Sequence, residues 1–207
     1  ANIRETDAIL HVLRCFDNDN ITHVDGTVDP VRDKEIIDYE LQLKDLETVE
    51  ARIAKTQKQA QTGGDKVAKM QYEVLKQYKE ALDQGLPARS VQFETVDEQK
   101  FARELFLLTN KPVMYVCNVD DASAVTGNKY VEAVREAVKN ENAQILIVAA
   151  QTEADIAELD TWEERQEFLA EIGLEESGVA RLIRAAYALL NLQTYFTAGA
   201  DEVRAWT

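Results

Sequence analysis

One apolar run that ends abruptly in polar residues constrains this chain more than any other feature. Pro112 opens the run, and residues 113–117 (VMYVC) follow it without any polar alternation. Such a run is typical of a strand that is buried on both faces of a parallel sheet. Residues 118–121 (NVDD) come directly after it. Ligands of open α/β sheets bind outside the carboxyl ends of the strands, so these polar residues stand where a small molecule would bind.

Two further apolar runs predict buried strands, over residues 7–16 and over residues 144–149. Amphipathic helices are predicted near residues 96–108 and 130–140, and helical structure resumes over residues 155–159, 161–172 and 177–190. Thr161 with Glu164 predicts a capping box at the start of one of these helices. Residues 17–33 predict a loop, and short extended pieces could lie at 21–24 and 90–93. Strands that alternate with helices indicate an α/β fold with a parallel sheet.

A long helical hairpin is predicted before the central strand. Apolar residues recur three and four positions apart over residues 31–61 and again over residues 66–84. Gly63 and Gly64 interrupt this pattern, and Asp65 suits the N-cap of the second helix. Two long helices joined by a short turn predict an antiparallel hairpin with coiled-coil packing.

Charge is distributed unevenly along the chain. The net charge of −15 argues against nucleic-acid binding by the whole surface. Between Arg52 and Lys79, however, seven cations face only two anions, so this window carries +5 and the rest of the chain −20. A partner contact at the hairpin, with RNA or with an acidic protein, is one interpretation of this bias, and a solvated coiled-coil surface is the other.

Several classes of protein find little support in the sequence. No apolar run approaches the roughly 18 residues of a membrane span, and we expect a cytoplasmic protein. Cys15 and Cys117 stand in apolar runs and are predicted to be buried, reduced thiols. His11 is either a core histidine or a catalytic one, and with only two histidines no metal site is predicted. No phosphate-binding glycine loop or nucleophile motif occurs, so no catalytic residue is predicted.

Several separated blocks of sequence resemble the YchF / Obg-like ATPase family of P-loop proteins. The blocks are NIRE at residues 2–5, DNITHV at 19–24 with VDP at 28–30, ELQLKDL at 40–46, GGDK at 63–66, NLQTYFTAG at 191–199 and EVRAWT at 202–207. The last two are similar to the entry of the family's C-terminal TGS domain, and residues 194–206 read as strand-like around a glycine turn.

This resemblance implies a domain organisation. Residues 1–40 and 91–190 would form a discontinuous part of a P-loop GTPase-like domain, residues 41–90 an inserted helical hairpin, and residues 191–207 the beginning of a TGS β-grasp domain. It also implies that the chain is an internal fragment, without the N-terminal P-loop and without most of TGS.

The resemblance places Asn118, Val119 and Asp121 at the base-recognition position, where ordinary relatives have N-K-x-D and this family has N-x-x-E. An aspartate accepts from guanine N1–H and the 2-amino group, whereas adenine presents an acceptor at N1. We therefore expect ATP as the nucleotide, with GTP open because Asp121 replaces Glu. Ala149 and Ala150 would line the base pocket. The alternative is that Asn118 only caps its own turn.

The resemblance further implies a ribosome-associated nucleotide hydrolase. Mg²⁺ and the phosphates would be held by the missing N-terminal segment, so the fragment alone is expected to be inactive. Five cations of the hairpin are candidates for contact with the ribosome or its RNA: Arg52, Lys55, Lys58, Lys66 and Lys69. A non-enzymatic α/β module that docks an acidic partner through the hairpin is the alternative function, and a redox or metal protein is a third. The oligomeric state is left open.

Overall fold

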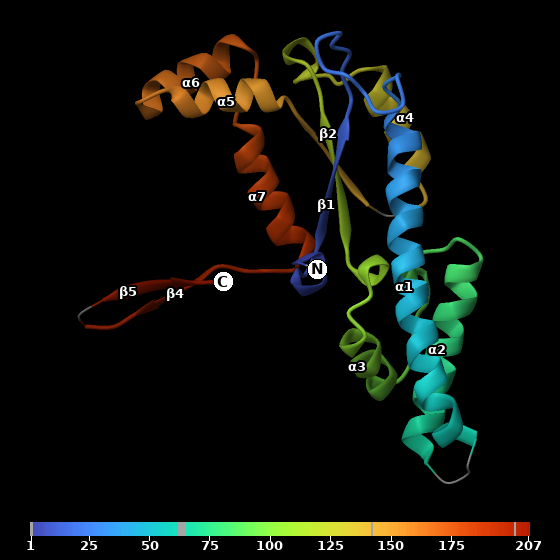
Figure 1. The fold of residues 1–207 in the computed structure, drawn as a ribbon. Coiled ribbons are helices and arrows are strands. Elements are labelled where there is room, and N and C mark those ends of the chain that lie inside the picture. Colours follow the sequence, from blue (N-terminus) through green and yellow to red (C-terminus); the bar gives the residue numbers. More distant parts are fainter. Residues whose placement is uncertain (1, 62–64, 142, 201) are drawn as a thin grey trace. The chain divides into compact units, whose positions relative to one another are not determined.

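The computed structural model describes residues 2–61, 65–141, 143–200 and 202–207, and the chain divides into two compact units (Figure 1). The first unit comprises residues 1–9 and 32–112, and the second comprises residues 10–31 and 113–207. Each is described by itself. The fold class is the predicted α/β class, with a parallel sheet and a helical hairpin.

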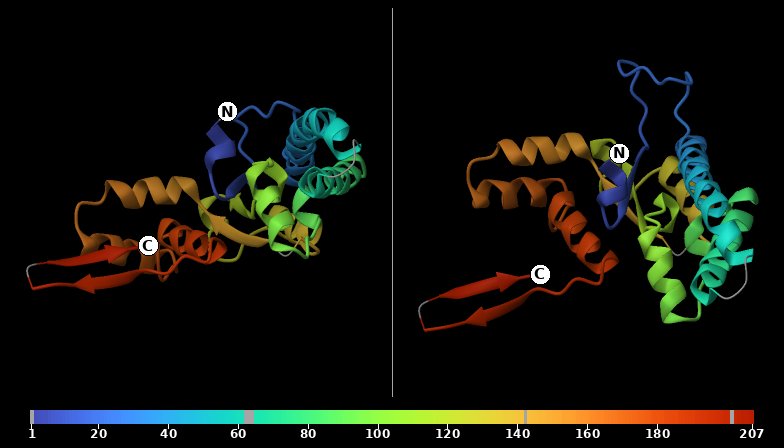
Figure 2. Two further views of the ribbon diagram at one scale, coloured as in Figure 1. Left: turned by 90° about the horizontal axis from the view of Figure 1, so that it is seen from below. Right: turned by 60° about the horizontal axis from the view of Figure 1, so that its bottom comes forward.

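The first unit is mainly helical. Its elements are η1 (Asn2–Glu5), α1 (Pro30–Gln61, which enters the unit at Arg32), α2 (Lys66–Asp83), η2 (Ala88–Ser90), α3 (Val96–Glu104) and η3 (Leu108–Asn110). Helices α1 and α2 lie side by side as the predicted hairpin (Figures 1 and 2). Asp65 caps α2 as predicted, because its Oδ1 accepts from the Ala68 N–H at 3.0 Å. The predicted tip at Gly63 and Gly64 lies outside the described residues.

The hairpin is held by an apolar core at its root. Val49 of α1 packs with Val74, Leu75 and Tyr78 of α2, all four of them buried, and α3 adds Phe101 to the cluster. The apolar stripe predicted along α1 is buried only in its second half. The first half, at Ile36, Tyr39 and Leu43, is exposed. The helical spacing of apolar residues therefore predicted the helix correctly, but it did not show that only the second half of the helix is buried.

The second unit is built on a three-stranded sheet in the order β1-β2-β3. Its strands are β1 (Ile9–Arg14, which enters the unit at Leu10), β2 (Val113–Asn118) and β3 (Gln144–Val148), followed at the chain end by the separate strands β4 (Tyr195–Ala198) and β5 (Val203–Trp206). Its helices are η4 (Asp121–Ser123), α4 (Lys129–Val138), α5 (Ala150–Glu158), α6 (Trp162–Glu171) and α7 (Gly178–Leu189). Strands β2 and β3 are parallel, as predicted, with Asn118 in register with Val148.

The two faces of the sheet are covered by different helices. Tyr115 and Cys117 pack with Val131 and Val134 of α4, and all four are fully buried. On the other face Met114 packs against α7. The central strand β2 is therefore buried on both faces, which confirms the prediction made from its apolar run.

The strand predicted over residues 7–16 forms at Ile9–Arg14, but only one of its faces is buried. Leu13 is buried on the α4 side, but the side chains of Leu10 and Val12 are 42% and 63% exposed. Strand β1 is an edge of the described sheet, and α7 packs on β2 and β3 rather than over β1. An apolar run predicts that a strand forms, whereas the burial of each of its faces depends on which elements pack against that face.

Several local predictions can be compared with the structure. Thr161 and Glu164 form the predicted capping box, with bonds of 3.2 and 3.0 Å, and these bonds hold the pKa of Glu164 below its usual value. Helix α5 begins at Ala150, five residues before the predicted start. Neither residues 21–24 nor residues 90–93 form a strand.

The chain ends in the predicted strand-like hairpin. Strands β4 and β5 pair antiparallel, with Tyr195 opposite Trp206, and both strands are exposed along their length. The Trp206 Nε1–H donates to Thr197 Oγ1 at 2.9 Å, which fixes the register between the strands. The assignment of this hairpin to a TGS domain, like the other domain boundaries, remains a prediction. Among the described residues, no helix is long and apolar enough to cross a membrane.

Candidate functional site

Asn118 organises the carboxyl edge of the sheet. Its Oδ1 accepts from the Ala150 N–H at 3.0 Å, and its backbone carbonyl accepts from the Cys15 N–H at 2.7 Å. One residue therefore ties the end of β2 to the residues that follow both neighbouring strands. The bond to Ala150 uses the amide oxygen and leaves the side-chain NH₂ group as a donor at this edge.

Val119 contributes to this edge through its backbone. The Val119 N–H donates to the Val148 carbonyl at 2.9 Å, which continues the pairing of β2 with β3 by one residue. Its side chain is 4% exposed and belongs to the core beneath α4. The side chain therefore packs away from the polar residues around it.

The two aspartates after Val119 have different partners. Asp120 caps η4, because its Oδ1 accepts from the Ser123 N–H at 2.9 Å. Asp121 is exposed, and its Oδ1 accepts from the Thr152 hydroxyl at 2.5 Å. Thr152 is 3% exposed and lies in the first turn of α5. The carboxylate at the fourth position of the motif is thus held on one side by a buried hydroxyl.

Ala149 and Ala150 lie where β3 passes into α5. Ala149 is the N-cap residue of α5 and is buried, and its methyl group cannot cap the helix. Ala149 belongs to the core beneath α4, whereas Ala150 is exposed beside Asn118. The structure brings together the predicted set Asn118, Val119, Asp121, Ala149 and Ala150, and sequence reasoning missed Thr152 among them. The helix was predicted to start only at residue 155, so the sequence did not mark Thr152 as a first-turn residue.

A second loop supports this edge from the side of α4. Asn128 caps α4 through its Oδ1, and its Nδ2 donates to the Cys15 carbonyl at 2.7 Å. Gly127 has a φ of +75°, and a Cβ there would lie 3.2 Å from Ile147 Cδ1. A glycine is therefore needed at that turn, both for its backbone conformation and for close approach to β3.

The polar groups at this edge provide both hydrogen-bond donors and acceptors. Asn118 offers donors, Asp121 offers a carboxylate with one oxygen already engaged, and the exposed Ala150 offers a small apolar surface. Such alternating donors and acceptors suit the polar edge of a nucleobase. A phosphate group would need cations or a cradle of backbone N–H groups, which these five predicted residues do not offer.

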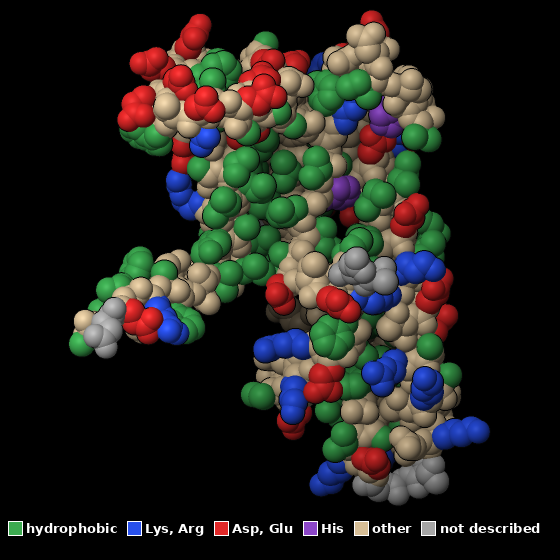
Figure 3. All heavy atoms as spheres, turned by 60° about the vertical axis from the view of Figure 1, so that its left-hand side comes forward, with side chains coloured by type: hydrophobic (Ala, Val, Ile, Leu, Met, Phe, Trp, Pro, Cys, Tyr) green, Lys and Arg blue, Asp and Glu red, His purple; other side chains and the backbone are tan. Residues whose placement is uncertain are grey.

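The candidate cations of the hairpin are all exposed: Arg52, Lys55, Lys58, Lys66 and Lys69. The two other cations of the basic window form ion pairs. Lys76 pairs with Glu73 at 3.3 Å, and Lys79 pairs with Glu50 and Asp83 at 2.6 and 3.1 Å. Figure 3 shows Lys and Arg side chains spread over the hairpin and acidic side chains gathered over α5 and α6. The five candidate cations lie closer in the sequence to the turn between α1 and α2 than these two ion-paired lysines do.

His11 lies in β1 and Cys117 in β2, and Cys15 directly follows β1. The His11 ring lies 5.7 Å from the Tyr115 ring and is half-buried. Cys15 and Cys117 are buried free thiols, as predicted. Hydrogen bonding to Cys117 and burial raise the pKa of Cys15 well above its ordinary value. Such a thiol is protonated at neutral pH, which makes it a poor nucleophile and metal ligand.

Comparisons with known proteins give a consistent result. No family model matches the chain. The chain is 51% identical to "Ribosome-binding ATPase YchF" of Bacillus subtilis (strain 168) and 38% identical to "Obg-like ATPase 1" of Rattus norvegicus. All of the chain is covered in both cases, but it spans only 56% and 53% of those relatives, about half their length.

A solved structure agrees with the sequence relatives. The "Structure of the Schizosaccharomyces pombe YchF GTPase" matches with a TM-score of 0.86 at 30% identity, over 98% of this chain and 55% of that one. The match covers nearly the whole chain, so the likeness is not confined to one element. Over its whole length the chain belongs to the YchF / Obg-like ATPase family.

Proposed function

We propose that the edge formed by Asn118, Val119, Asp121, Ala149 and Ala150 binds the base of ATP, and that the chain is part of a ribosome-associated nucleotide hydrolase. The observation that carries this proposal is the bond from Ala150 N–H to Asn118 Oδ1, which engages the amide oxygen and leaves the NH₂ group as a donor at the carboxyl edge of a parallel sheet. The relatives, which are named as ribosome-binding and Obg-like ATPases, support it.

The base would be read by few contacts. The Asn118 NH₂ group would donate to N7 of the purine, and the backbone after β2 would line one side of the ring. Asp121 would face the six-membered ring, where adenine offers its 6-amino group as a donor. Guanine would offer two donors to the same carboxylate, so GTP remains the competing nucleotide.

The phosphates and Mg²⁺ would be held elsewhere. The residues at this edge suit a base, but they provide no cationic or backbone cradle for a triphosphate. Phosphoryl transfer depends on positioning these groups. We therefore place the phosphate and Mg²⁺ ligands in a part of the protein outside these 207 residues, and expect no hydrolysis by these residues alone.

Competition for a fluorescent ATP analogue tests the proposed site on the intact protein that carries this chain. The expected result is displacement by ATP at lower concentration than by GTP, with Asn118→Ala weakening ATP by roughly tenfold, the loss expected for one or two hydrogen bonds in a dry site. Asp160→Ala, far along the chain from this edge, is the control. Equal affinities in the wild type and Asn118→Ala would rule out a base site here.

In the same assay, Asp121→Glu restores the family's residue. A wild-type preference for GTP that this substitution reverses would show that Asp121 recognises guanine.

Ribosome contact through the hairpin is the second part of the proposal. Exposed cations at Arg52, Lys55, Lys58, Lys66 and Lys69 support a contact with RNA phosphates. Co-sedimentation with ribosomes should then fall as salt rises and should be lost after RNase treatment of the ribosomes. Binding that survives RNase would instead favour the alternative, a non-enzymatic module that docks an acidic protein partner.

A further inference from the structure

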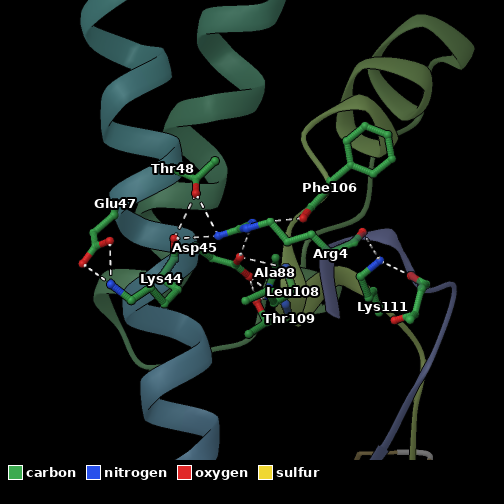
Figure 4. Close-up of polar contacts among 11 residues, drawn as sticks. Arg4, Lys44, Asp45, Glu47, Thr48, Ala88, Phe106, Leu108, Thr109 and Lys111 are labelled. Atoms are coloured by element: carbon green, nitrogen blue, oxygen red, sulfur yellow. Dashed lines mark hydrogen bonds and ion pairs between the residues drawn. The ribbon is translucent and has the colours of Figure 1, made fainter. Parts of the chain in front are cut away.

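Each of the two compact units contains a carboxylate that binds two successive backbone N–H groups. In the first unit the fully buried Asp45 accepts from the first two N–H groups of η3 at 2.7 Å each (Figure 4). In the second unit Glu153 accepts from the Gly178 N–H at 2.5 Å and from the Val179 N–H at 3.1 Å, with one oxygen for each. Glu153 is only half-buried, and it lies in the first turn of α5, next to residues of the proposed base site.

The Glu153 carboxylate completes the start of α7. The first N–H groups of an α-helix have no partner within the helix. Ser177 Oγ accepts from the Ala180 N–H at 3.1 Å, and Glu153 accepts from the two N–H groups between these residues. An anion is also favoured at this end by the helix dipole. The link from α5 to α7 therefore consists of two charge-assisted hydrogen bonds.

Gly178 provides the space for this link. A Cβ at Gly178 would lie 2.8 Å from Glu153 Oε1 and 3.1 Å from Val148 Cγ1. The first of these distances is shorter than real Cβ contacts, so any other residue would displace the carboxylate from the N–H group that it binds. The close approach of Glu153 to α7 therefore depends on a glycine at this position.

Helix α7 is itself fastened to the sheet. Ala185 packs with Met114 and Leu146 on the face of the sheet opposite to α4. Near the start of the helix, the Arg181 guanidinium donates to the Ile147 carbonyl at 2.9 Å. The N-terminal end of α7 is thus attached to the last part of β3, and it gives Glu153 a fixed point to bind.

The turn of α5 that carries Glu153 also carries two bonds of the proposed base site. The Ala150 N–H donates to Asn118 Oδ1 at 3.0 Å, and the Thr152 hydroxyl donates to Asp121 Oδ1 at 2.5 Å. Ala150, Thr152 and Glu153 belong to one helical turn, so a displacement of one of them moves the other two. Three bonded positions hold this turn, against β2, η4 and α7.

We propose that Glu153 is a positioning residue of the base site. By holding the first turn of α5 against α7, its carboxylate fixes the direction in which the Asn118 amide presents its NH₂ group to the purine. This inference rests on the proposed function, in which that group donates to N7. The competing account is that Glu153 caps α7 and stabilises the fold without affecting recognition of the base.

A comparison of ATP with 7-deaza-ATP separates the two accounts, because 7-deaza-ATP has a C–H group in place of N7. Direct titration of the intact protein that carries this chain gives both affinities. Wild type should bind ATP roughly fivefold more tightly than 7-deaza-ATP, the value of about one hydrogen bond. Equal affinities in wild type would contradict the proposed contact of Asn118 with N7, so this arm tests the proposed function before any variant is made.

The variants of Glu153 test the inference itself. Glu153→Ala should bind ATP roughly fivefold more weakly and 7-deaza-ATP with nearly unchanged affinity, so the preference for ATP should disappear. Glu153→Gln should behave alike, because an amide has one acceptor oxygen for two N–H groups and carries no charge. Glu158→Ala removes an exposed carboxylate from the last turn of the same helix, and this control should keep the wild-type preference. A wild-type preference in Glu153→Ala, whether both affinities fall equally or neither changes, would overturn the inference.

Gly178→Ala tests the same link from the side of α7. Its methyl group should displace the carboxylate while Glu153 remains, and alanine favours a helix more than glycine does. We expect the preference for ATP to disappear here too, with unchanged affinity for 7-deaza-ATP as the evidence of correct folding. In the double variant with Glu153→Ala the methyl group meets no carboxylate, so the affinity for ATP should stay within about twofold of that of Glu153→Ala. A wild-type preference in Gly178→Ala, or a further loss of roughly fivefold in the double variant, would overturn the inference.

Discussion

The Thr152 hydroxyl donates to Asp121 Oδ1 at 2.5 Å, so one oxygen of the carboxylate in the N-x-x-D motif is committed to the protein. Guanine pairs with such a carboxylate through two donors, one for each oxygen. Thr152→Val removes the hydroxyl with little change of shape. We expect it to raise the affinity for GTP relative to ATP by roughly fivefold, the value of about one hydrogen bond.

Nucleotide competition on the intact protein measures this ratio, and Thr152→Ser is the control because it keeps a hydroxyl at the same place. A ratio that stays constant, or that shifts toward ATP, would show that Thr152 does not restrain guanine recognition.

If the hairpin cations contact RNA, their replacement should change how ribosome binding depends on salt concentration. Replacement of Lys55, Lys58, Lys66 and Lys69 by Glu should weaken ribosome binding and flatten its dependence on salt concentration, because fewer counterions are released from RNA on binding. The control replaces Lys76 and Lys79, which already pair with acidic side chains. Sedimentation at several salt concentrations gives the slope. A slope that is the same in both variants would exclude the hairpin tip as the site of contact.

Asp45→Asn should destabilise the first unit by about 2–4 kcal/mol. The carboxylate accepts three hydrogen bonds in a fully buried position, and an amide would turn an NH₂ group toward one of the donors. Urea unfolding measures the free energy. Glu47→Gln is the control, since Glu47 forms an exposed pair with Lys44 and should change stability by less than about 0.5 kcal/mol. The role given to Asp45 would be wrong if both variants had the same stability.

The raised pKa of Tyr78 leads us to expect a lower free energy of unfolding at high pH. Burial, and to a smaller extent the charge of Asp45, raises the pKa of Tyr78 from 10.0 to about 12. The folded state therefore keeps a proton that the unfolded state loses above pH 10. Stability should fall as pH rises from 10 toward 12, by up to about 2–3 kcal/mol. Urea unfolding of wild type and Tyr78→Phe checks this. The variant should lose less stability over this interval, and parallel curves would contradict the assignment.

The sequence predicted much of the fold because its strongest signals are local. The apolar run before Asn118 identifies the central strand, and parallel strands necessarily end at one edge, so Asn118 and Ala149 could be placed together. The bond from Thr152 to Asp121 could not be predicted, because it depends on α5 starting at Ala150. The exposure of one face of β1 was not predicted for a different reason. An apolar run does not show which elements pack against each face of the strand.

The contact of Arg4 with Asp45 joins residues far apart in the sequence, and no local pattern predicts it. A signal for Asp45 was nevertheless present. Asp45 stands four residues before Val49, on the face of α1 that the apolar period marks as buried. A carboxylate at such a position needs buried donors, and only the folded chain shows that the turn at Leu108 and Thr109 supplies them.

Photolabelling with 8-azido-ATP tests the central claim most directly, because it reports where the base lies. On the intact protein, we predict that the label falls on peptides that contain residues 117–122 or 149–152, and that excess ATP prevents the labelling. Asn118→Ala should lose the label at both places. Label that falls on other peptides, while ATP still protects, would show that the carboxyl edge of β2 and β3 is not the base site.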